Sequence, residues 1–371
     1  MKGHCCQTCF ACSSGCGAAP SLPTPSPADP TPAPAPLAPP ADRGATGATK
    51  QLLETLRAAS ASDAFLFGHH NTNYEGQNFR DPTGAGMRSD VAAGTNGSFP
   101  AMYGYNLDWV ARATTNANVT ALAMNARRAA KGGVLHMFWQ AANPVTNGSA
   151  QDLDGSPITQ ILPGGSANAV WITWMDRVAK FFLDVGAPAI FRPFHENTGG
   201  WFWWGKAAAT PRQYRAAWNY TADYLQSKGV HSLLYAYAPS KPATTNAWEL
   251  AFTEAYPGDD RVDIECFDHY GANDFHEALV QDCEAVVAFA AARGKVPAIC
   301  EFGVSEGIQN TNLVDWYNSS FLQPVVRSPC GQIAFAYTWR NSGSAYWVPM
   351  PGNATYSGFA EFYRSPHVIF A

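Results

Sequence analysis

The sequence predicts an α/β protein with the architecture of a (β/α)8 TIM barrel. From about Thr46 onward, short apolar runs alternate with longer amphipathic ones. Most of the short runs are apolar at nearly every position, as strands of a parallel sheet are when helices cover both of its faces. Eight such runs separated by helices are typical of a closed barrel, although seven or nine true strands would also fit the alternation.

The expected strands and helices follow one another along the chain. The eight expected strands are Ala64–Gly68, Phe99–Tyr105, Gly133–Trp139, Pro188–Phe194, Ser232–Ala238, Val262–Tyr270, Val296–Gly303 and Gln332–Trp339. The expected helix Trp171–Val185 carries its large apolar side chains on one stripe. Another helix begins at Pro211, whose preset dihedral suits a first turn, and ends at Gly229, a common helix stop. The same pattern predicts helices over Phe275–Arg293 and Asn312–Val326.

The first 45 residues differ in composition from the rest of the chain. Five cysteines crowd the beginning, at Cys5, Cys6, Cys9, Cys12 and Cys16. A run rich in Pro, Ala, Ser and Thr follows, and proline at this density gives an extended spacer that cannot bury a core. We therefore predict a Cys-rich stub and a disordered Pro/Ala-rich linker over residues 1–45, and one (β/α)8 catalytic domain over residues 46–371. Disulfides, a metal site, or a tail without function are alternative interpretations of the first cysteines.

The overall composition argues against several classes of partner. Charged residues make up 14% of the 371 residues, the formal net charge is -5, and no long run of Lys or Arg occurs. Binding to nucleic acid or to an anionic membrane surface is therefore not expected. No run of about 18 apolar residues predicts a membrane span, and no apolar stretch of roughly 7–15 residues after Met1 resembles a signal peptide. Six N-x-Ser/Thr sequons nevertheless favour export.

The later cysteines and two adjacent histidines have more than one interpretation. The four later cysteines could form bridges or be free thiols, and we expect free core thiols for Cys266 and Cys300 because both fall within buried strands. The other two later cysteines are Cys283 and Cys330. His69 and His70 are neighbours in a strand, so their side chains point to opposite faces and are not expected to bind one metal ion.

Two of the expected strands deliver a carboxylate where they leave the core. The fourth apolar run leads directly to Glu196, and the seventh contains Glu301 near its end. In (β/α)8 barrels the loops that follow the strands build the active site. Other strand ends carry polar or aromatic residues, namely His69, His70, His136, Asp268, Tyr270, Trp339 and Arg340. We therefore expect these side chains to gather at the barrel mouth.

A pair of carboxyl groups at one barrel mouth suits the hydrolysis of a glycosidic bond. A protonated acid supplies a proton to the leaving oxygen, and an ionised carboxylate attacks or supports the anomeric carbon from the opposite face. Carboxyl groups about 5–5.5 Å apart leave no room for an intervening water, so the configuration is retained. The environment must separate the two pKa values, and Arg192, His195 and Arg340 are candidates for that tuning. Alternatively, either glutamate pairs with an arginine only to close the barrel.

The loop after Glu196 is rich in aromatic residues. Trp201, Phe202, Trp203 and Trp204 are consecutive, and four aromatic side chains in one loop cannot all face a core. Some of them are therefore expected at the surface, where aromatic planes can stack on the apolar faces of sugar rings.

The segment from Arg192 to Gly205 reads RPFHENTGGWFWWG and resembles the acid/base motif of glycoside hydrolase family 26. Members of that family are mainly endo-β-1,4-mannanases with (β/α)8 barrels, in which the acid/base follows strand four and the nucleophile ends strand seven. The resemblance therefore implies that Glu196 is the acid/base. It implies that Glu301, in the sequence Glu-Phe-Gly, is the nucleophile.

The same resemblance implies roles for residues at other strand ends. It implies that Tyr270 donates a hydrogen bond to the nucleophile, and that Trp201, Trp339 and Arg340 shape the pocket around the reacting sugar. The other implied substrate-binding residues are His136, His195 and Asp268.

We therefore expect a retaining endo-β-1,4-mannanase that hydrolyses internal bonds of mannan, glucomannan or galactomannan without a cofactor or a metal. We expect a secreted, extracellular monomer whose partner is a β-mannan-type polysaccharide or oligosaccharide. A β-1,3-xylanase or a mixed-linkage β-glucanase of the same family is an alternative. A barrel that binds carbohydrate without cleaving it is a third hypothesis, against which the presence of both carboxylates argues.

Overall fold

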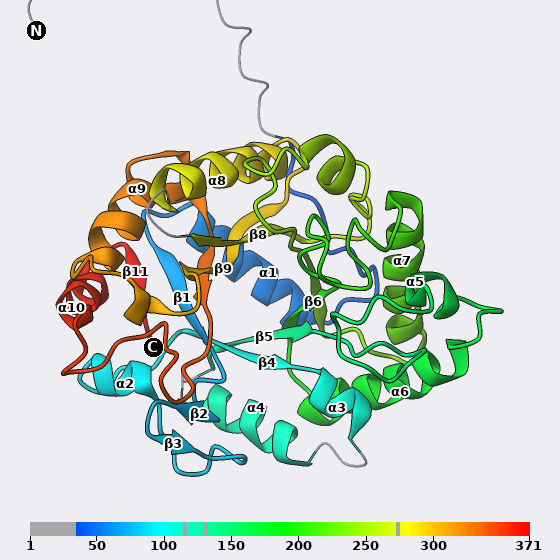
Figure 1. Ribbon diagram of the computed structural model, residues 1–371, viewed down its shortest axis with the longest axis horizontal. Coiled ribbons are helices and arrows are strands. Elements are labelled where there is room, and N and C mark those ends of the chain that lie inside the picture. Colours follow the sequence, from blue (N-terminus) through cyan, green and yellow to red (C-terminus); the bar gives the residue numbers. More distant parts are fainter. Residues whose placement is uncertain (1–34, 114–116, 130–131, 272–274) are drawn as a thin grey trace, which may run out of the picture. The chain divides into compact units, whose positions relative to one another are not determined.

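The computed structural model describes residues 35–113, 117–129, 132–271 and 275–371. Eight parallel strands form a closed ring in the order β1-β4-β5-β6-β7-β8-β9-β10, and β10 pairs back onto β1 (Figure 1). Each of the eight apolar runs that the sequence predicted as strands overlaps one of these strands. The prediction of a (β/α)8 TIM barrel is confirmed.

The ring consists of β1 (Phe65–His70), β4 (Met102–Asn106), β5 (Val134–Trp139), β6 (Ala189–Pro193), β7 (Leu233–Tyr237), β8 (Ile264–Gly271), β9 (Val296–Val304) and β10 (Phe335–Thr338). Three very short strands lie outside it. The strands β2 (Glu75–Gly76) and β3 (Phe79–Arg80) form an antiparallel pair, and β11 (Val368–Ile369) pairs with the beginning of β1. Composition gave no signal for these three, because each contains only two residues.

The α-helices are α1 (Gly47–Ser60), α2 (Asp90–Gly94), α3 (Asp108–Arg112), α4 (Ala117–Ala129), α5 (Pro157–Gln160), α6 (Asn168–Val185), α7 (Pro211–Ser227), α8 (Phe275–Ala291), α9 (Gln323–Val326) and α10 (Tyr356–Arg364). Two π-helical turns, Trp248–Thr253 and Tyr317–Leu322, and two 3₁₀ turns, Ile308–Asn310 and Pro329–Gln332, complete the connections. Figure 1 shows the helices arranged around the ring of strands.

Local sequence explains where the longer helices begin and end. Helix α7 begins after Thr210, whose hydroxyl accepts a hydrogen bond from the Gln213 N–H while the Gln213 side chain accepts one from the Thr210 N–H. This reciprocal capping satisfies two N–H groups that the helix itself cannot pair. The predicted single helix over Asn312–Val326 is wrong. It is a π-helical turn followed by the short α9, because Pro324 has no N–H to donate to the carbonyl of Ser320.

Helix α1 closes the end of the barrel at which the strands begin. Leu52, Leu53 and Leu56 of α1 pack into the same buried cluster as Ile190 and Leu234, which lie near the beginnings of β6 and β7. Figure 1 shows α1 across the ring, behind the strands. Because α1 covers this end of the interior, the opposite end, where the parallel strands finish, is available for a binding site.

The last part of the predicted linker is ordered. Ala45 is buried, the Ala41 N–H donates to the carboxylate of Asp263 at 2.7 Å, and Asp42 lies 2.8 Å from the His231 ring nitrogen. Residues 35–45 therefore contact the barrel, and the prediction of disorder is wrong for them, because polar partners on the barrel satisfy their backbone and side chains. Residues 1–34, including the five first cysteines, lie outside the described residues.

Two disulfides link the later cysteines. Cys266 of β8 is bonded to Cys300 of β9, and Cys283 of α8 is bonded to Cys330, with Cα–Cα distances of 5.6 and 5.7 Å. The expectation that Cys266 and Cys300 are free core thiols is wrong. The pairing of β8 with β9 brings their backbones within the distance that a disulfide can span, which the linear sequence does not reveal.

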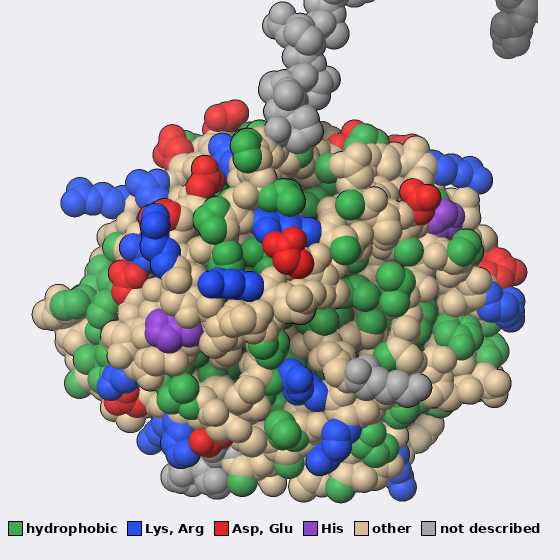
Figure 2. Space-filling view, turned by 180° about the vertical axis from the view of Figure 1, so that it is seen from behind, with side chains coloured by type: hydrophobic (Ala, Val, Ile, Leu, Met, Phe, Trp, Pro, Cys, Tyr) green, Lys and Arg blue, Asp and Glu red, His purple; other side chains and the backbone are tan. Residues whose placement is uncertain are grey.

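The face opposite to that of Figure 1 carries Lys and Arg side chains interspersed with Asp and Glu side chains (Figure 2). A mixed surface of this kind does not form the single basic field that attracts nucleic acid. Within the described ranges, no helix combines the length and the hydropathy needed to cross a membrane.

Candidate active site

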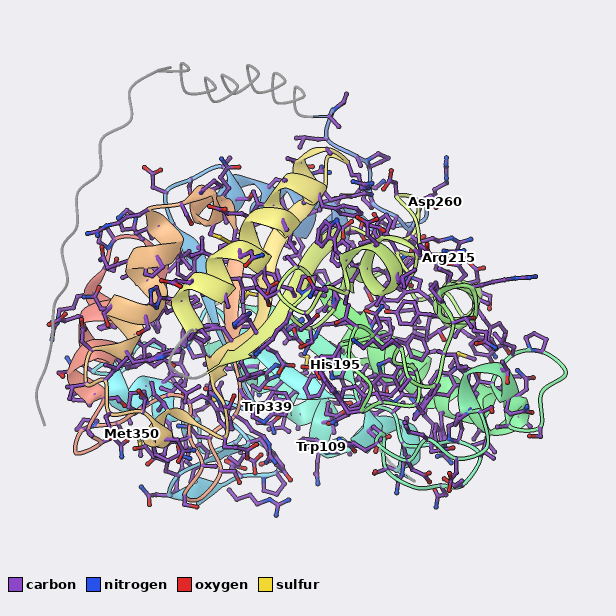
Figure 3. All side chains as sticks on the ribbon, turned by 45° about the horizontal axis from the view of Figure 1, so that its top comes forward. Trp109, His195, Arg215, Asp260, Trp339 and Met350 are labelled. Carbon is purple, nitrogen blue, oxygen red and sulfur yellow. A yellow bond between two sulfur atoms is a disulfide. The ribbon has the colours of Figure 1, made fainter. Side chains whose placement is uncertain are left out.

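The two predicted carboxylates both lie at the open end of the barrel. Glu301 is a residue of β9, and Glu196 is in the loop three residues after β6 ends. Glu301 lines a cavity of about 360 Å³ and Glu196 lines one of about 350 Å³, and Tyr270 lines both. Figure 3 shows His195 and Trp339 near the middle of the barrel, with Trp109 closer to its edge. The strand ends therefore converge as the sequence predicted.

Glu301 is buried and its oxygens are held on both sides. Oε2 accepts a hydrogen bond of 2.8 Å from the Tyr270 hydroxyl, and Oε1 accepts one from the Arg192 guanidinium. The His70 Nε2 atom lies 3.8 Å from Oε1. Burial, and next the charge of Glu301, raise the pKa of Tyr270 well above its ordinary value. The hydroxyl therefore keeps its proton and acts as a hydrogen-bond donor to Glu301. Donors on both oxygens therefore fix the orientation of this carboxylate.

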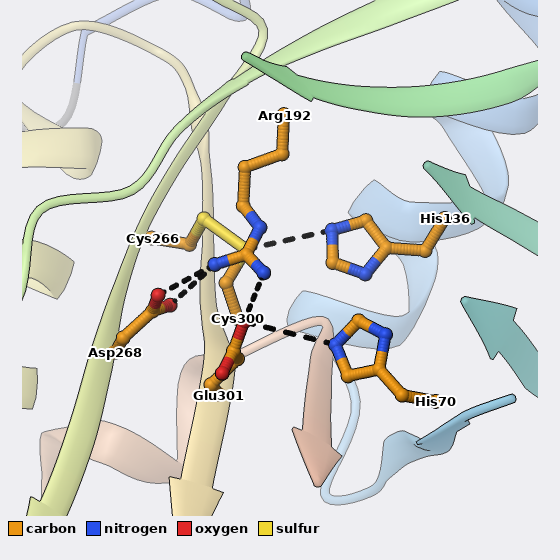
Figure 4. Close-up of a disulfide and its surroundings, with 7 residues drawn as sticks. All are labelled: His70, His136, Arg192, Cys266, Asp268, Cys300 and Glu301. Atoms are coloured by element: carbon orange, nitrogen blue, oxygen red, sulfur yellow. Dashed lines mark hydrogen bonds and ion pairs between the residues drawn. A yellow bond between two sulfur atoms is a disulfide. The ribbon is translucent and has the colours of Figure 1, made fainter. Parts of the chain in front are cut away.

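Arg192 joins Glu301 to a second buried carboxylate. Its guanidinium is fully buried and donates to both oxygens of Asp268 at 2.8 and 2.6 Å, as well as to Glu301 (Figure 4). Burial alone would lower the pKa of Arg192, but the charges of Asp268 and Glu301 hold it above its ordinary value. The ring of Phe138 lies 5.6 Å below the guanidinium carbon. The position of Glu301 is therefore coupled to Asp268 through one rigid, planar cation.

An irregularity in β9 aims Glu301 at the mouth. Phe267 of β8 pairs with Ile299, but the next residue, Asp268, pairs with Glu301, so Cys300 is an extra residue in β9. Bulges of this kind locally re-aim side chains and occur frequently beside active sites. The extra residue brings the carboxylates of Asp268 and Glu301 into register, where Arg192 contacts both.

Glu196 has fewer polar partners. It is partly exposed, and its Oε2 accepts one hydrogen bond of 2.7 Å, from the indole N–H of Trp201. Burial, and next the charge of Glu301, raise the pKa of Glu196 to about 7, although the Trp201 hydrogen bond and Arg192 act in the opposite direction. A carboxyl group with this pKa is partly protonated near neutral pH and can both give and take a proton.

The backbone that carries Glu196 is strained. Phe194 and Glu196 have positive φ angles of 50° and 56°, a region that side-chain-bearing residues rarely adopt. The Glu196 N–H donates to the Ala238 carbonyl at 2.6 Å, and the Tyr214 hydroxyl donates to the Phe194 carbonyl at 2.9 Å. These contacts, one from the residue directly after β7 and one from α7, hold the strained conformation in place.

The aromatic run after Glu196 divides into a buried and an exposed part. Phe202, Trp203 and Trp204 are at most 4% exposed, and Trp201 is 46% exposed. The Trp204 indole donates to the His195 carbonyl at 2.6 Å, which fixes the backbone next to Glu196. The expectation that part of this run lies at the surface is confirmed for Trp201 alone. A Cβ atom on Gly199 would lie 2.4 Å from the Trp201 ring, so glycine there lets the indole fold back toward Glu196.

Three buried histidines lie around Arg192 and are neutral, with His136 in the barrel interior next to Cys300. Burial, followed by the charge of Arg192 or of a neighbouring imidazole, lowers the pKa values of His70, His136 and His195 well below their ordinary value. The imidazoles of His70 and His136 lie 5.9 Å apart, and the ring of Trp339 lies 4.8 Å from that of His70. Neutral rings can exchange hydrogen bonds with sugar hydroxyls without adding charge to the site.

A third cavity, of about 410 Å³, adjoins the cavity of Glu301. It shares Trp339 with the cavity of Glu301, and its other lining residues include His70, Tyr74, Glu75, Trp109 and Arg340. Arg340 donates to the carboxylate of Glu75, and the rings of Tyr74 and Trp109 lie 4.8 Å apart. Cavities on both sides of that of Glu301 give room for more than one sugar unit.

Sequence reasoning found the two carboxylates but misjudged their neighbours. Arg192 was a candidate for tuning the two pKa values, and its charge does lower the pKa of Glu196, but its hydrogen bonds go to Asp268 and Glu301. Arg340 was also expected to tune the pair, but it pairs with Glu75 instead. Trp347, which lines the Glu301 cavity, was missed because it lies in an irregular loop with no periodic pattern.

His70 was expected at the mouth from its position at the end of the first strand, but no substrate-binding role was assigned to it, although it lines the third cavity. In the described part of the chain, no group of three or more His, Cys, Asp or Glu side chains is arranged to hold a metal ion.

A closed (β/α)8 barrel with carboxyl groups at the ends of its fourth and seventh strands defines the class of protein, a glycoside hydrolase. The sequence model of Glycosyl hydrolase family 26 matches residues 41–318, and the chain belongs to this family. The predicted family resemblance is confirmed.

The chain is also similar to individual mannanases. It is 30% identical over 356 residues to a mannan endo-1,4-beta-mannosidase of Bifidobacterium adolescentis, a match that covers 86% of this chain and 34% of that protein. The chain thus spans about a third of that relative's length. The catalytic domain of an endo-beta-1,4-mannanase of Bacillus sp. JAMB-750 superposes with a TM-score of 0.82 at 29% identity, covering 92% of this chain and 96% of that one. A modular endo-beta-1,4-mannanase of Cellulomonas fimi gives 0.80 at 32% identity, covering 89% and 77%.

Proposed function

We propose that this protein is a retaining endo-β-1,4-mannanase that hydrolyses internal bonds of mannan, glucomannan or galactomannan. The observation that carries the proposal is the unequal environment of its two mouth carboxyls. Glu196 has a pKa raised to about 7 and one neutral donor, while Glu301 is held by Arg192 and Tyr270. The names of the similar mannanases support the substrate.

In the proposed first step, protonated Glu196 gives its proton to the glycosidic oxygen as Glu301 attacks the anomeric carbon. The leaving sugar departs as an alcohol, and the remaining sugar is esterified to Glu301. Esterification removes the negative charge of Glu301, which is one cause of the raised pKa of Glu196. The pKa of Glu196 therefore falls once the ester forms, so Glu196 can take a proton from the water that hydrolyses the ester.

The neighbouring groups have supporting roles in this proposal. Arg192 and Tyr270 hold Glu301 in the attacking orientation, and Asp268 holds Arg192. We propose that Trp201, Trp339 and Arg340 contact the sugars, together with His136 and His195. The exposed indole of Trp201 and the cavity that contains Trp339 support this assignment.

Endo action, secretion and a monomeric state are further parts of the proposal. Cavities on both sides of that of Glu301 support binding in the middle of a polysaccharide. Two disulfides support an oxidising, extracellular location.

Product analysis tests the proposal directly. The protein is incubated with β-1,4-mannan, glucomannan, β-1,3-xylan and mixed-linkage β-glucan, and the products are separated while proton NMR follows the first anomer released. We expect manno-oligosaccharides of mixed length from mannan, with the β-anomer appearing first. Cleavage of only xylan or β-glucan would contradict the substrate, and the α-anomer appearing first would contradict retention.

A further inference from the structure

The disulfide Cys266–Cys300 lies inside the barrel, directly beneath the candidate catalytic groups. Both cysteines are fully buried and belong to the cluster that fills the barrel interior. Cys300 immediately precedes Glu301, and Cys266 lies two residues before Asp268 on the neighbouring strand. One covalent bond thus joins the two strands that carry the two carboxylate partners of Arg192.

The disulfide closes the irregularity in β9. Ile299 and Phe302 both belong to the outer cluster, between strands and helices, and Cys300 belongs to the inner one. Glu301 faces Arg192 at the mouth, so two consecutive residues face the barrel axis, which a regular strand does not allow. In the strand pairing Cys266 is opposite Ala298, yet its side chain is bonded to Cys300, two residues further along. The disulfide therefore links Cys300, the extra residue of β9, covalently to the neighbouring strand β8.

The disulfide lies where a change of strand register would alter the direction of the Glu301 side chain. An unpaired bulge residue is a place where a strand can change register, and a shift of one residue would turn Glu301 away from the mouth. Cys300 is also close to a candidate substrate-binding group, because its Sγ atom lies 3.9 Å from the His136 Nε2 atom. Figure 4 shows the disulfide beside Arg192, between the side of Asp268 and the side of His136.

We propose that Cys266 and Cys300 are positioning residues whose disulfide holds the β9 bulge and thereby aims Glu301 at the sugar. The proposal rests on the proposed glycosidase function. It assigns to this bond a part in turnover, beyond a contribution to stability.

The second disulfide provides a matched control. Cys283–Cys330 joins α8 to a 3₁₀ turn outside the barrel, and neither residue lines the three mouth cavities. The sequence separations of the two bonds are similar, 34 and 47 residues, so their loss should loosen the unfolded chain to similar extents.

The test compares two double variants, Cys266→Ala/Cys300→Ala and Cys283→Ala/Cys330→Ala, on whichever β-glycoside the wild type cleaves best. We measure kcat, KM and Tm, with kinetics well below the lower Tm. We expect the barrel variant to lose about ten- to a hundredfold in kcat, with a much smaller change in KM, because a small misplacement of a reacting group has effects of this size. The control should keep kcat within about twofold of the wild type despite a lower Tm.

A third variant separates the covalent bond from the volume that it fills. In Cys266→Val/Cys300→Ala a larger apolar side chain replaces much of the lost sulfur volume, and we expect kcat to stay low. Wild-type kcat in this variant, or equal kcat in the two alanine variants, would overturn the proposal.

If the barrel variants do not fold, the wild-type protein still provides the test. It is treated with tris(2-carboxyethyl)phosphine in mild urea, and samples are taken for activity and for mass spectrometry of each disulfide. Activity should fall in step with the reduction of Cys266–Cys300, and full activity with that bond reduced would overturn the proposal. A wild type that cleaves no β-glycoside would instead contradict the proposed function, which is measured first.

Discussion

The ends of β6 and β9 carry similar carboxyl groups in different settings. Glu301 lies within a strand, is buried, and has Arg192 and Tyr270 on its oxygens. Glu196 lies in a loop, on a backbone of positive φ, and accepts one hydrogen bond from the indole of Trp201.

The difference bears on the proposed roles of Glu196 as the acid and of Glu301 as the nucleophile. Burial acts against the charge of any carboxylate, and only a sufficient number of donors offsets it. Glu301 has a cation and a hydroxyl, whereas Glu196 has a single neutral donor and the negative charge of Glu301 nearby. The number and charge of the donors therefore support different proposed roles for the two carboxyl groups.

Removing either carboxyl group should have the largest effect. Glu301→Gln should lower kcat/KM on mannan by about 10⁴-fold or more, because no nucleophile remains. Glu196→Gln should lower it by about 10²–10⁴-fold, the usual contribution of a general acid. An aryl mannoside with a dinitrophenolate leaving group needs no proton, so its first step should stay fast in Glu196→Gln and not in Glu301→Gln. Near-normal mannan hydrolysis by either variant would refute that residue's role.

Removing the cation that holds Glu301 should have the next largest effect. Arg192→Met should lower kcat by about 10²–10³-fold, because it removes the positive charge beside the nucleophile. It should also lower the free energy of unfolding by about 3–5 kcal/mol, because Asp268 stays buried without a partner. Arg192→Lys keeps the charge but loses the planar, forked arrangement of donors. Its kcat and its free energy of unfolding should therefore lie between those of the wild type and those of Arg192→Met. Kinetics and urea unfolding measure both effects, and a fully active Arg192→Met would break the distinction between the two strand ends.

Removing the hydroxyl that contacts Glu301 should have a smaller effect. Tyr270→Phe should lower kcat by about ten- to a hundredfold, the range expected for a hydrogen bond to a charged group. Tyr363→Phe is the matched control, because that hydroxyl contacts Ser98 in another part of the protein. Equal activity of the two variants would mean that Tyr270 does not contribute to turnover.

Removing the indole N–H of Trp201, which donates to Glu196, should mainly shift the pH profile of kcat/KM. The Trp201 hydrogen bond lowers the pKa of Glu196, so Trp201→Phe should raise that pKa. Because Glu196 must be protonated to act as the acid, the basic limb of the kcat/KM profile should move to higher pH, by less than about one unit. Trp109→Phe has no contact with Glu196 and should alter KM without moving this limb. A shift to lower pH in Trp201→Phe would contradict the assignment.

Much of the fold was predictable because the buried parallel strands are apolar at nearly every position in the sequence. The same strands ended in Glu196 and Glu301, so the position of each carboxylate at the mouth followed from the barrel prediction. The strand pair β2–β3 and the π-helical turn Tyr317–Leu322 were not predictable, since two-residue strands and wider helical turns have no distinct hydrophobic period.

The sequence did not reveal which residues are the partners of the buried charges. Arg192 is four residues from Glu196 in sequence, but its guanidinium binds Asp268 and Glu301, 76 and 109 residues away. The disulfide of Cys266 depends in the same way on which strands become neighbours. Such pairings are set by barrel closure and by the bulge in β9, and neither is a local property of the chain.

The pKa of Glu196 tests the central distinction most directly. Carbon-13 NMR of protein labelled at the glutamate carboxyl carbons can follow this group, identified by the resonance that Glu196→Gln lacks. We expect a pKa of about 7 in the wild type and a lower value in Glu301→Gln, where the neighbouring negative charge is gone. A pKa near the ordinary 4.5 in both proteins would contradict the account.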